Sequence, residues 1–206
     1  MLSIRVPTRK LANSRCGSIS LTSTFAIRPG DEVTTAQTVE TGMPSDASLR
    51  AQAEAVAECL LARGMTVVTA ESCTGGWVAK TLTDIAGSSS WFECGVVAYS
   101  YEAKESLLGV QPQTLERTGA VSQETVVEMV SGALARYGAS VAVAVTGIAG
   151  PSGGTPGKPV GTVWIGWKRR GGYARAEQFH FGGDREAVRR QTVGAALDGV
   201  RRILTS

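Results

Sequence analysis

Histidine is almost absent from this chain of 206 residues, which contains only His180. A Ser-His-Asp or Cys-His catalytic mechanism would have to use this residue. His180 lies between Phe179 and Phe181 in a predicted strand, and we interpret it as a structural or surface residue rather than a catalytic base. Any nucleophile in the chain is therefore expected to depend on a different base.

Ligands for a metal ion are also scarce. The chain has no histidine pair, and its four cysteines, Cys16, Cys59, Cys73 and Cys94, lack the spacing of zinc ligands. The acidic residues form no magnesium motif, and we expect scattered acids such as Glu71 to be solvated. We predict no metal site, and the unpaired cysteines indicate a reducing, cytoplasmic setting.

Two further absences limit the partners. No apolar run is long enough to span a bilayer, so no membrane association is expected. The formal net charge is only +3, and no basic and aromatic interleaving of the kind used on single-stranded nucleic acid is present. We interpret the late basic residues, Arg189 and Arg190 among them, as solvated helix faces and expect no nucleic-acid partner.

Residues 1–45 differ in composition from the rest of the chain. Basic residues precede the first acid, Asp31, and serine and threonine are frequent. This composition resembles an organellar transit segment, although we favour a disordered extension or a start codon placed too far upstream. The segment lacks sustained periodicity and is left out of the fold prediction.

Residues 46–206 alternate between strand and helix patterns, which predicts one three-layer α/β/α domain. The sheet should be mixed and mostly parallel, ending in an antiparallel hairpin around Gly171 and Gly172. Predicted strands cover residues 65–69, 95–99, 140–145, 160–167 and 173–181. A first predicted helix is capped by Ser45 or Asp46 and ends at Gly64. Further predicted helices cover residues 74–85, 101–108 and 122–137, and a last helix follows Asp184.

The most informative segment is the junction between the first of these strands and the next helix. It reads Glu-Ser-Cys-Thr-Gly-Gly and contains two possible nucleophiles, Ser72 and Cys73. Glycines at 75 and 76 let the backbone approach a ligand closely. The helix N-terminus that follows favours a negative charge, such as a phosphate or an oxyanion.

Without histidine, lysine is the usual base for a serine nucleophile. Lys104 is the candidate, because it follows the strand that ends at Tyr99 and should lie at the same sheet edge as Ser72. To accept a proton near neutral pH, Lys104 must have a pKa lowered by burial or by a nearby cation. On sequence alone, an ordinary solvated lysine would also fit.

Two other segments could bind an anion. Thr146 and Gly147 end a predicted strand and lead into a glycine-rich loop that can present backbone N–H groups, although a plain connecting loop would read the same way. Arg185 lies in the first turn of the last helix, and an arginine fork suits a phosphate.

Several motifs in the same order closely resemble the CinA carboxyl-terminal domain family over about residues 48–205. These motifs are residues 69–76, 99–104, 146–151, 159–163 and 183–185. The resemblance implies hydrolysis of the carboxamide of nicotinamide mononucleotide in pyridine-nucleotide salvage, without a metal or organic cofactor. Some family members instead carry a separate pyrophosphatase domain, for which this chain is too short.

The resemblance also implies roles for individual residues. Ser72 would attack the amide carbon, Lys104 would take its proton, and Tyr99 would orient the pair. Oxyanion or substrate contacts would come from Thr146 and Gly147 together with the N–H groups of Thr74 and Gly75. From its charge, we also expect Arg185 to bind the substrate phosphate.

Four points stay open at this stage. The family commonly has a small polar residue where this chain has Tyr101, which puts substrate fit in question. A thiol mechanism could use Cys73 with Glu71 and Lys104 as acid and base, and a non-catalytic nucleotide-binding module linked to competence or DNA damage would need no neutral lysine. A homo-oligomer is compatible with a domain of this size.

Overall fold

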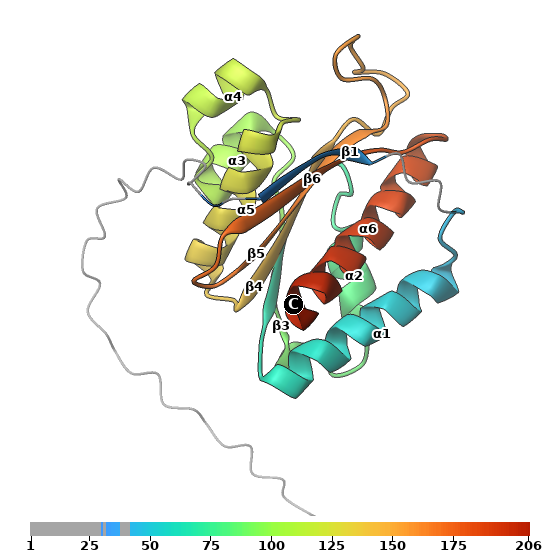
Figure 1. Cartoon of the computed structure of the whole chain (residues 1–206), viewed down its shortest axis with the longest axis vertical. Helices are drawn as coiled ribbons and strands as arrows, with labels where there is room; N and C mark the ends of the chain where they lie inside the picture. The colour runs from blue at the N-terminus through green and yellow to red at the C-terminus, as the bar shows by residue number, and fades with distance from the viewer. Residues whose placement is uncertain (1–29, 31, 38–41) are drawn as a thin grey trace, which may run out of the picture.

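The computed structural model describes residues 30, 32–37 and 42–206, which form an α/β domain (Figure 1). The strands are β1 Glu32–Gln37, β2 Val67–Glu71, β3 Phe92–Val97, β4 Val141–Gly147, β5 Thr162–Arg169 and β6 Ala174–His180. The helices are α1 Asp46–Arg63, α2 Trp77–Thr83, α3 Tyr101–Leu108, α4 Pro112–Thr118, α5 Gln123–Tyr137 and α6 Arg185–Thr205, with a short 3-10 turn at Ser88–Ser90.

The sheet has the order β1-β6-β5-β4-β2-β3. The β1–β6, β4–β2 and β2–β3 pairings are parallel, whereas β4–β5 and β5–β6 are antiparallel. The predicted mixed, mostly parallel sheet with a terminal hairpin is thus confirmed.

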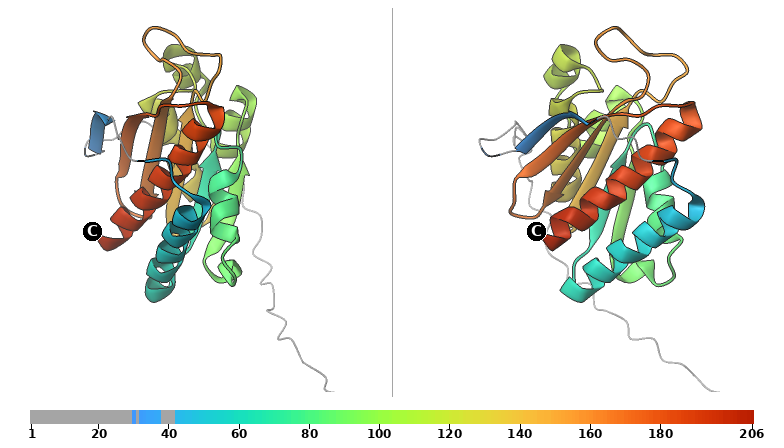
Figure 2. Two further views of the ribbon diagram at one scale, coloured as in Figure 1. Left: turned by 90° about the vertical axis from the view of Figure 1, so that its right-hand side faces the viewer. Right: turned by 45° about the vertical axis from the view of Figure 1, so that its right-hand side comes forward.

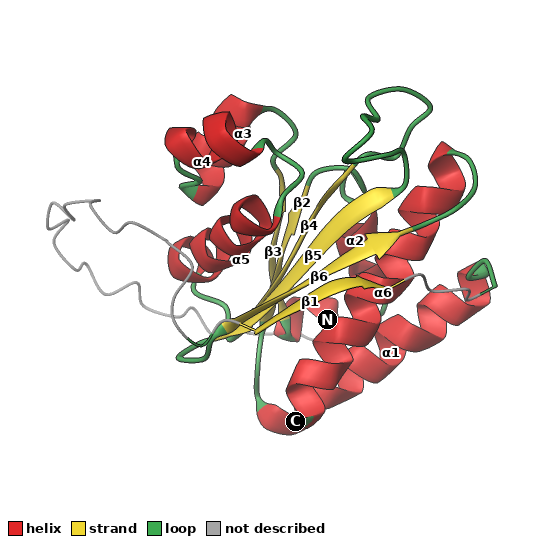
Figure 3. Ribbon diagram, turned by 45° about the horizontal axis from the view of Figure 1, so that its top comes forward, coloured by secondary structure: helices red, strands yellow, loops and turns green. Residues whose placement is uncertain are grey.

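Helices cover both faces of the sheet, which gives the predicted three layers (Figures 2 and 3). On one face α1, α2 and α6 contact one another, and α6 packs on β4 and β5. On the other face α5 packs on β2, β4, β5 and β6, and α3 and α4 contact α5. No helix in the described part of the chain is long and apolar enough to cross a membrane.

Strand β4 shows how the two faces differ. Its valines at 141, 143 and 145 are buried in the cluster shared with α1 and α6. Its alanines at 142 and 144 lie in the cluster shared with α5. Because strand side chains alternate between faces, the small residues let α5 approach the sheet closely.

Two elements were missing from the sequence prediction. Strand β1 falls within residues 1–45, which the prediction left out of the fold, and it pairs with β6 at the sheet edge. The transit-segment and disorder hypotheses otherwise concern residues outside the described part. Helix α4 begins with Pro112 in its first turn, a position that proline favours because its missing N–H is not needed there.

The register of β2 positions the functional site. Glu71, the last residue of β2, is paired with Val97 of β3 on one side and Val145 of β4 on the other. The loops that follow these three parallel strands therefore leave the same edge of the sheet. This edge is where open α/β sheets bind ligands.

Candidate active site

Ser72 and Lys104 meet in the interior of this edge. Ser72 directly follows β2, and its N–H donates to the Val145 carbonyl at 3.0 Å. Lys104 lies on α3, whose N-cap, Ser100, accepts a hydrogen bond from the Ala103 N–H. The distance from Lys104 Nζ to Ser72 Oγ is 3.2 Å, and the two residues are 1% and 8% exposed. The alternative of a solvated Lys104 is therefore wrong.

The surroundings of Lys104 favour its neutral form. Nζ also donates to the carbonyls of Ala98, at 2.9 Å, and Tyr99, at 3.1 Å, and no carboxylate pairs with it among the described residues. Burial lowers the pKa of Lys104 below its ordinary 10.5, with Cys73 acting weakly in the opposite direction. With all three hydrogens, Nζ also donates to Ser72 Oγ. In its neutral form the amine can keep its two N–H bonds on the two carbonyls and accept a hydrogen bond from the Ser72 hydroxyl with its lone pair.

Glu71 is buried rather than solvated, contrary to the sequence prediction. Its carboxylate accepts hydrogen bonds from the Gly76, Val78 and Ala79 N–H groups, at 3.0, 3.1 and 2.8 Å. It also accepts from the hydroxyls of Thr74, at 2.6 Å, and Thr69, at 3.3 Å. The start of α2 is thus occupied by the protein's own anion, so the expected free helix terminus for a phosphate or oxyanion is not present.

Cys73 is fully enclosed next to Ser72. Burial raises the pKa of its thiol to about 12. Since the thiolate is the nucleophilic form of cysteine, this environment disfavours attack by Cys73.

The threonines predicted to contact substrate have their hydroxyls engaged. Thr74 donates to Glu71, and Thr146 donates to the Ala120 carbonyl at 2.8 Å. Both side chains are fully buried. Gly75 is exposed, and its N–H closes a turn onto the Ser72 carbonyl at 3.1 Å. The Thr74 N–H, by contrast, donates to no group in the described part of the chain.

Tyr99 links the buried pair to the surface. Its carbonyl accepts from Lys104, while its hydroxyl accepts from Arg185 Nη2 at 3.2 Å. Arg185 also donates to the Gly150 carbonyl at 2.8 Å, which holds α6 against the loop after β4. Arg185 is exposed and belongs to the rim of the site, whereas Gly147 is partly buried at the end of β4.

Tyr101, the departure from the family pattern, also has a defined contact. Its hydroxyl accepts from the Ala120 N–H at 3.3 Å. The carbonyl of Ala120 is the acceptor for Thr146, so Tyr101 connects α3 to the end of β4 through a single residue.

Arg189 on α6 is the main residue that the sequence analysis misread as part of a solvated face. Its Nε donates to the Cys73 carbonyl at 3.1 Å, and its Nη2 donates to the Thr74 carbonyl at 2.8 Å. Its guanidinium lies 5.3 Å from the centre of the Trp77 ring. These contacts span more than a hundred residues of sequence, and no local pattern signals them.

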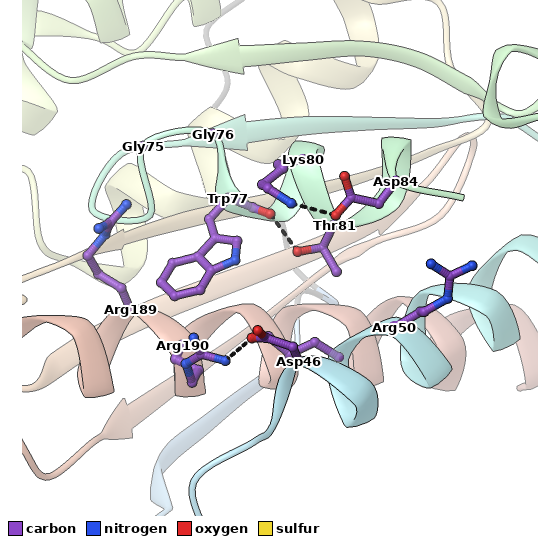
Figure 4. Close-up of a pocket in the computed structure, with 11 residues that line it drawn as sticks. Asp46, Arg50, Gly75, Gly76, Trp77, Lys80, Thr81, Asp84, Arg189 and Arg190 are labelled. Atoms are coloured by element: carbon purple, nitrogen blue, oxygen red, sulfur yellow. Dashed lines mark hydrogen bonds and ion pairs between the residues drawn. The ribbon is translucent and has the colours of Figure 1, made fainter. Parts of the chain in front are cut away.

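A cavity of about 630 Å³ lies behind the loop that follows β2 (residues 72–76, here called the nucleophile loop after the predicted role of Ser72), between α1, α2 and α6 (Figure 4). Its walls include Gly75, Gly76, Trp77, Arg189 and Arg190. Within the cavity, Lys80 pairs with Asp84 at 2.6 Å, and Arg190 pairs with Asp46.

His180 is exposed at the end of β6, as expected of a surface residue. Over the residues that the structure describes, no group of three or more histidine, cysteine, aspartate or glutamate side chains gathers in a way that could hold a metal ion.

Comparison with known sequences gives a consistent result. The family model described as the CinA C-terminal domain matches residues 49–204. The nicotinamide-nucleotide amidohydrolase PncC of Escherichia coli K12 is 54% identical over 153 residues, which cover 74% of this chain and 93% of the relative. A CinA-like protein of Akkermansia muciniphila is 50% identical over 157 residues, covering 76% of this chain and 37% of that longer protein.

Solved structures agree with this assignment. The competence/damage inducible protein CihA of Agrobacterium tumefaciens superposes with a TM-score of 0.75 at 42% identity, covering 81% of this chain and 99% of that one. The competence damage-inducible protein A of Klebsiella pneumoniae gives a TM-score of 0.74 at 43% identity, over 76% and 97% of the two chains. The chain belongs to the CinA C-terminal domain family.

Proposed function

We propose that this protein hydrolyses the carboxamide of nicotinamide mononucleotide to nicotinate mononucleotide and ammonia, as a step of pyridine-nucleotide salvage. The single observation that carries the proposal is the buried Ser72–Lys104 pair, with 3.2 Å between its reactive atoms. The substrate follows from relatives named nicotinamide-nucleotide amidohydrolase that align over nearly their whole length.

The reaction would proceed through an acyl-enzyme. Ser72 Oγ attacks the carboxamide carbon while its proton passes to the neutral Lys104 amine. The tetrahedral intermediate then collapses as its C–N bond breaks, and Lys104 returns a proton to the departing ammonia. A water molecule, deprotonated by Lys104, cleaves the acyl ester and releases the carboxylate product and the Ser72 hydroxyl.

Binding groups surround this pair. The Thr74 N–H lies in the nucleophile loop and has no partner among the described residues, so it is suited to the oxyanion. We also expect Gly75, Thr146 and Gly147 to contact the substrate. Arg185, exposed beside Tyr99, would bind the phosphate through its guanidinium fork.

Nucleophile identity separates the serine mechanism from the thiol alternative. We expect Ser72→Ala to lower ammonia release by at least about 10³-fold with an unchanged fold, since the residue that forms the covalent intermediate is lost. Cys73→Ala should stay within about threefold of the parent protein, because its thiol is held in the unreactive form. An active, folded Ser72→Ala protein would refute the mechanism.

The decisive experiment is to incubate the protein with nicotinamide mononucleotide and to measure ammonia and nicotinate mononucleotide together. Equal amounts of the two products are expected. Tight binding of the nucleotide without turnover would instead favour a non-catalytic module. A chelator in the same assay should leave the rate unchanged, and a loss of activity restored by a divalent ion would contradict the proposed metal-free mechanism.

A further inference from the structure

Arg189 contacts the nucleophile loop from the side opposite to Lys104. We propose that Arg189 is a positioning residue that fixes the Cys73–Thr74 peptide so that the Thr74 N–H can stabilise the oxyanion. This inference rests on the proposed amide hydrolysis.

The grip of Arg189 on the loop is bidentate. Its Nε and Nη2 atoms hold two successive carbonyls, those of Cys73 and Thr74, at 3.1 and 2.8 Å. Two bonds from one planar group restrict rotation of both peptide units, which one bond would not do. The loop residues that follow are glycines with positive φ, +61° at Gly75 and +94° at Gly76, so the backbone itself offers little resistance to other conformations.

Because Arg189 holds the Cys73 carbonyl, the geometry of the Cys73–Thr74 peptide bond fixes the orientation of the Thr74 N–H. In a trans peptide the C=O and the N–H point in opposite directions. Since Arg189 holds the Cys73 carbonyl from the α6 side, the N–H of the same peptide points away from α6. Lys104 approaches Ser72 from α3, on the other face of the sheet. The Thr74 N–H is thereby directed away from Arg189 and towards the side from which Lys104 acts.

The burial of Thr74 indicates that its N–H has a functional role. Thr74 is fully buried, and a buried donor without a partner is costly, so such groups are rare outside functional sites. A substrate oxyanion would supply the partner. The positive charge of Arg189 on the carbonyl of the same peptide should also make this N–H a stronger donor.

Packing keeps Arg189 in place without a carboxylate. Among the described residues it has no acidic partner, and its guanidinium lies against the Trp77 ring. Its neighbour Arg190 lies against the same ring, at 5.0 Å, but pairs with Asp46 and Glu186 instead of the loop (Figure 4). The two adjacent arginines thus share a helix and an aromatic contact and differ in whether they hold the nucleophile loop.

This difference supplies a matched control. We expect Arg189→Ala to lower kcat for ammonia release by about 10- to 100-fold, with KM within about threefold, since the lost interaction acts on the transition state. Arg190→Ala should keep kcat within about threefold of the parent. Arg189→Lys should recover only part of the rate, because an ammonium group is a point charge and cannot hold two carbonyls as a fork does.

Chemical rescue distinguishes positioning from a general loss of structure. The cavity of about 630 Å³ that Arg189 lines leaves room for added guanidinium in Arg189→Ala. Low concentrations of guanidinium should raise kcat of this variant several-fold and leave the parent and Arg190→Ala unchanged, with the pH at half-maximal rate unaltered.

The outcomes distinguish a failure of the proposed role of Arg189 from a failure of the proposed amide hydrolysis. Equal kcat values for Arg189→Ala and Arg190→Ala, a loss confined to KM, or an Arg189→Lys protein as active as the parent would overturn the role of Arg189. If Arg189→Ala does not fold, the kcat of Arg189→Lys relative to that of the parent tests the role of Arg189 by itself. A parent protein that releases no ammonia would overturn the proposed function itself.

Discussion

Two buried ionisable groups lie on either side of Ser72, and their environments are opposite. Glu71 is 1% exposed and receives three backbone N–H groups and two hydroxyls, so its negative charge is fully hydrogen-bonded. Lys104 is equally buried but faces two carbonyls and the Ser72 hydroxyl, and no carboxylate in the described part of the chain pairs with it. The charge of Glu71 is therefore compensated by hydrogen bonds, whereas a charge on Lys104 would have no counter-ion.

In the proposed mechanism, this difference separates an ion with a structural role from a base. A buried charge that is completely hydrogen-bonded holds its surroundings rigid, and here it fixes the turn between β2 and α2. A buried amine without a counter-ion is driven to its neutral form instead. The loop that carries Ser72 is thus held from the α6 face, and the proposed base, Lys104, reaches it from the α3 face.

The largest expected effect follows from removing Lys104, the buried group without a counter-ion. Lys104→Met should lower the rate of ammonia release by about 10²- to 10⁴-fold, the usual contribution of a general base. The control is Lys80→Met, which removes an exposed lysine of α2 paired with Asp84 and should leave the rate within about twofold. An equal loss of activity in steady-state assays of the two variants would show that Lys104 has no special role in the reaction.

Removing the charge of Glu71 should affect the fold first. In Glu71→Gln an amide N–H₂ replaces one acceptor oxygen and faces backbone donors, which should lower the free energy of unfolding by about 2–4 kcal/mol. Urea denaturation measures this, with Glu54→Gln on the exposed face of α1 expected to change stability by less than about 0.5 kcal/mol. Equal stability of the two variants would show that Glu71 does not anchor the loop.

Lys104 should have the opposite effect on stability. Because the pKa of Lys104 is lowered on folding, the unfolded chain binds more protons between that lowered pKa and 10.5, and stability rises with pH across this window. Relative to the parent, Lys104→Met should gain stability as the pH falls from 10.5 towards neutral, because only the parent must give up a proton from Lys104 on folding. A gain that is independent of pH would argue against a desolvated lysine.

The smallest effect is expected at the rim. Tyr101→Phe removes one hydrogen bond to the Ala120 N–H and should raise KM for nicotinamide mononucleotide by about two- to fivefold without changing kcat. A drop in kcat comparable to that of Lys104→Met would place Tyr101 in the chemistry instead.

The local part of this site was predictable from sequence. An apolar β-branched run followed by Glu-Ser-Cys-Thr-Gly-Gly predicted the turn that carries Ser72. Parallel strand order then predicted that a loop after the next strand, with Lys104, would reach the same edge. The alternation of strand and helix patterns was sufficient for the three-layer fold.

The environments of the two ions were not predictable in the same way. Glu71 looked like an ordinary acid, because a side chain that folds back onto N–H groups five to eight residues later has no sequence signature. Arg189 looked solvated, because its partners at Cys73 and Thr74 are more than a hundred residues away. Strand β1 was missed because edge pairing to β6 needs only backbone groups and little hydrophobic pattern.

The protonation of Lys104 decides whether this residue can act as the base. NMR of protein labelled at the lysine side chains, with the Lys104 signal assigned from Lys104→Met, would follow the titration of Nζ. The expected result is a pKa clearly below 10.5 that coincides with the pH at which kcat/KM for ammonia release rises. A Lys104 that titrates at or above 10.5 while the enzyme is fully active at neutral pH would contradict the account.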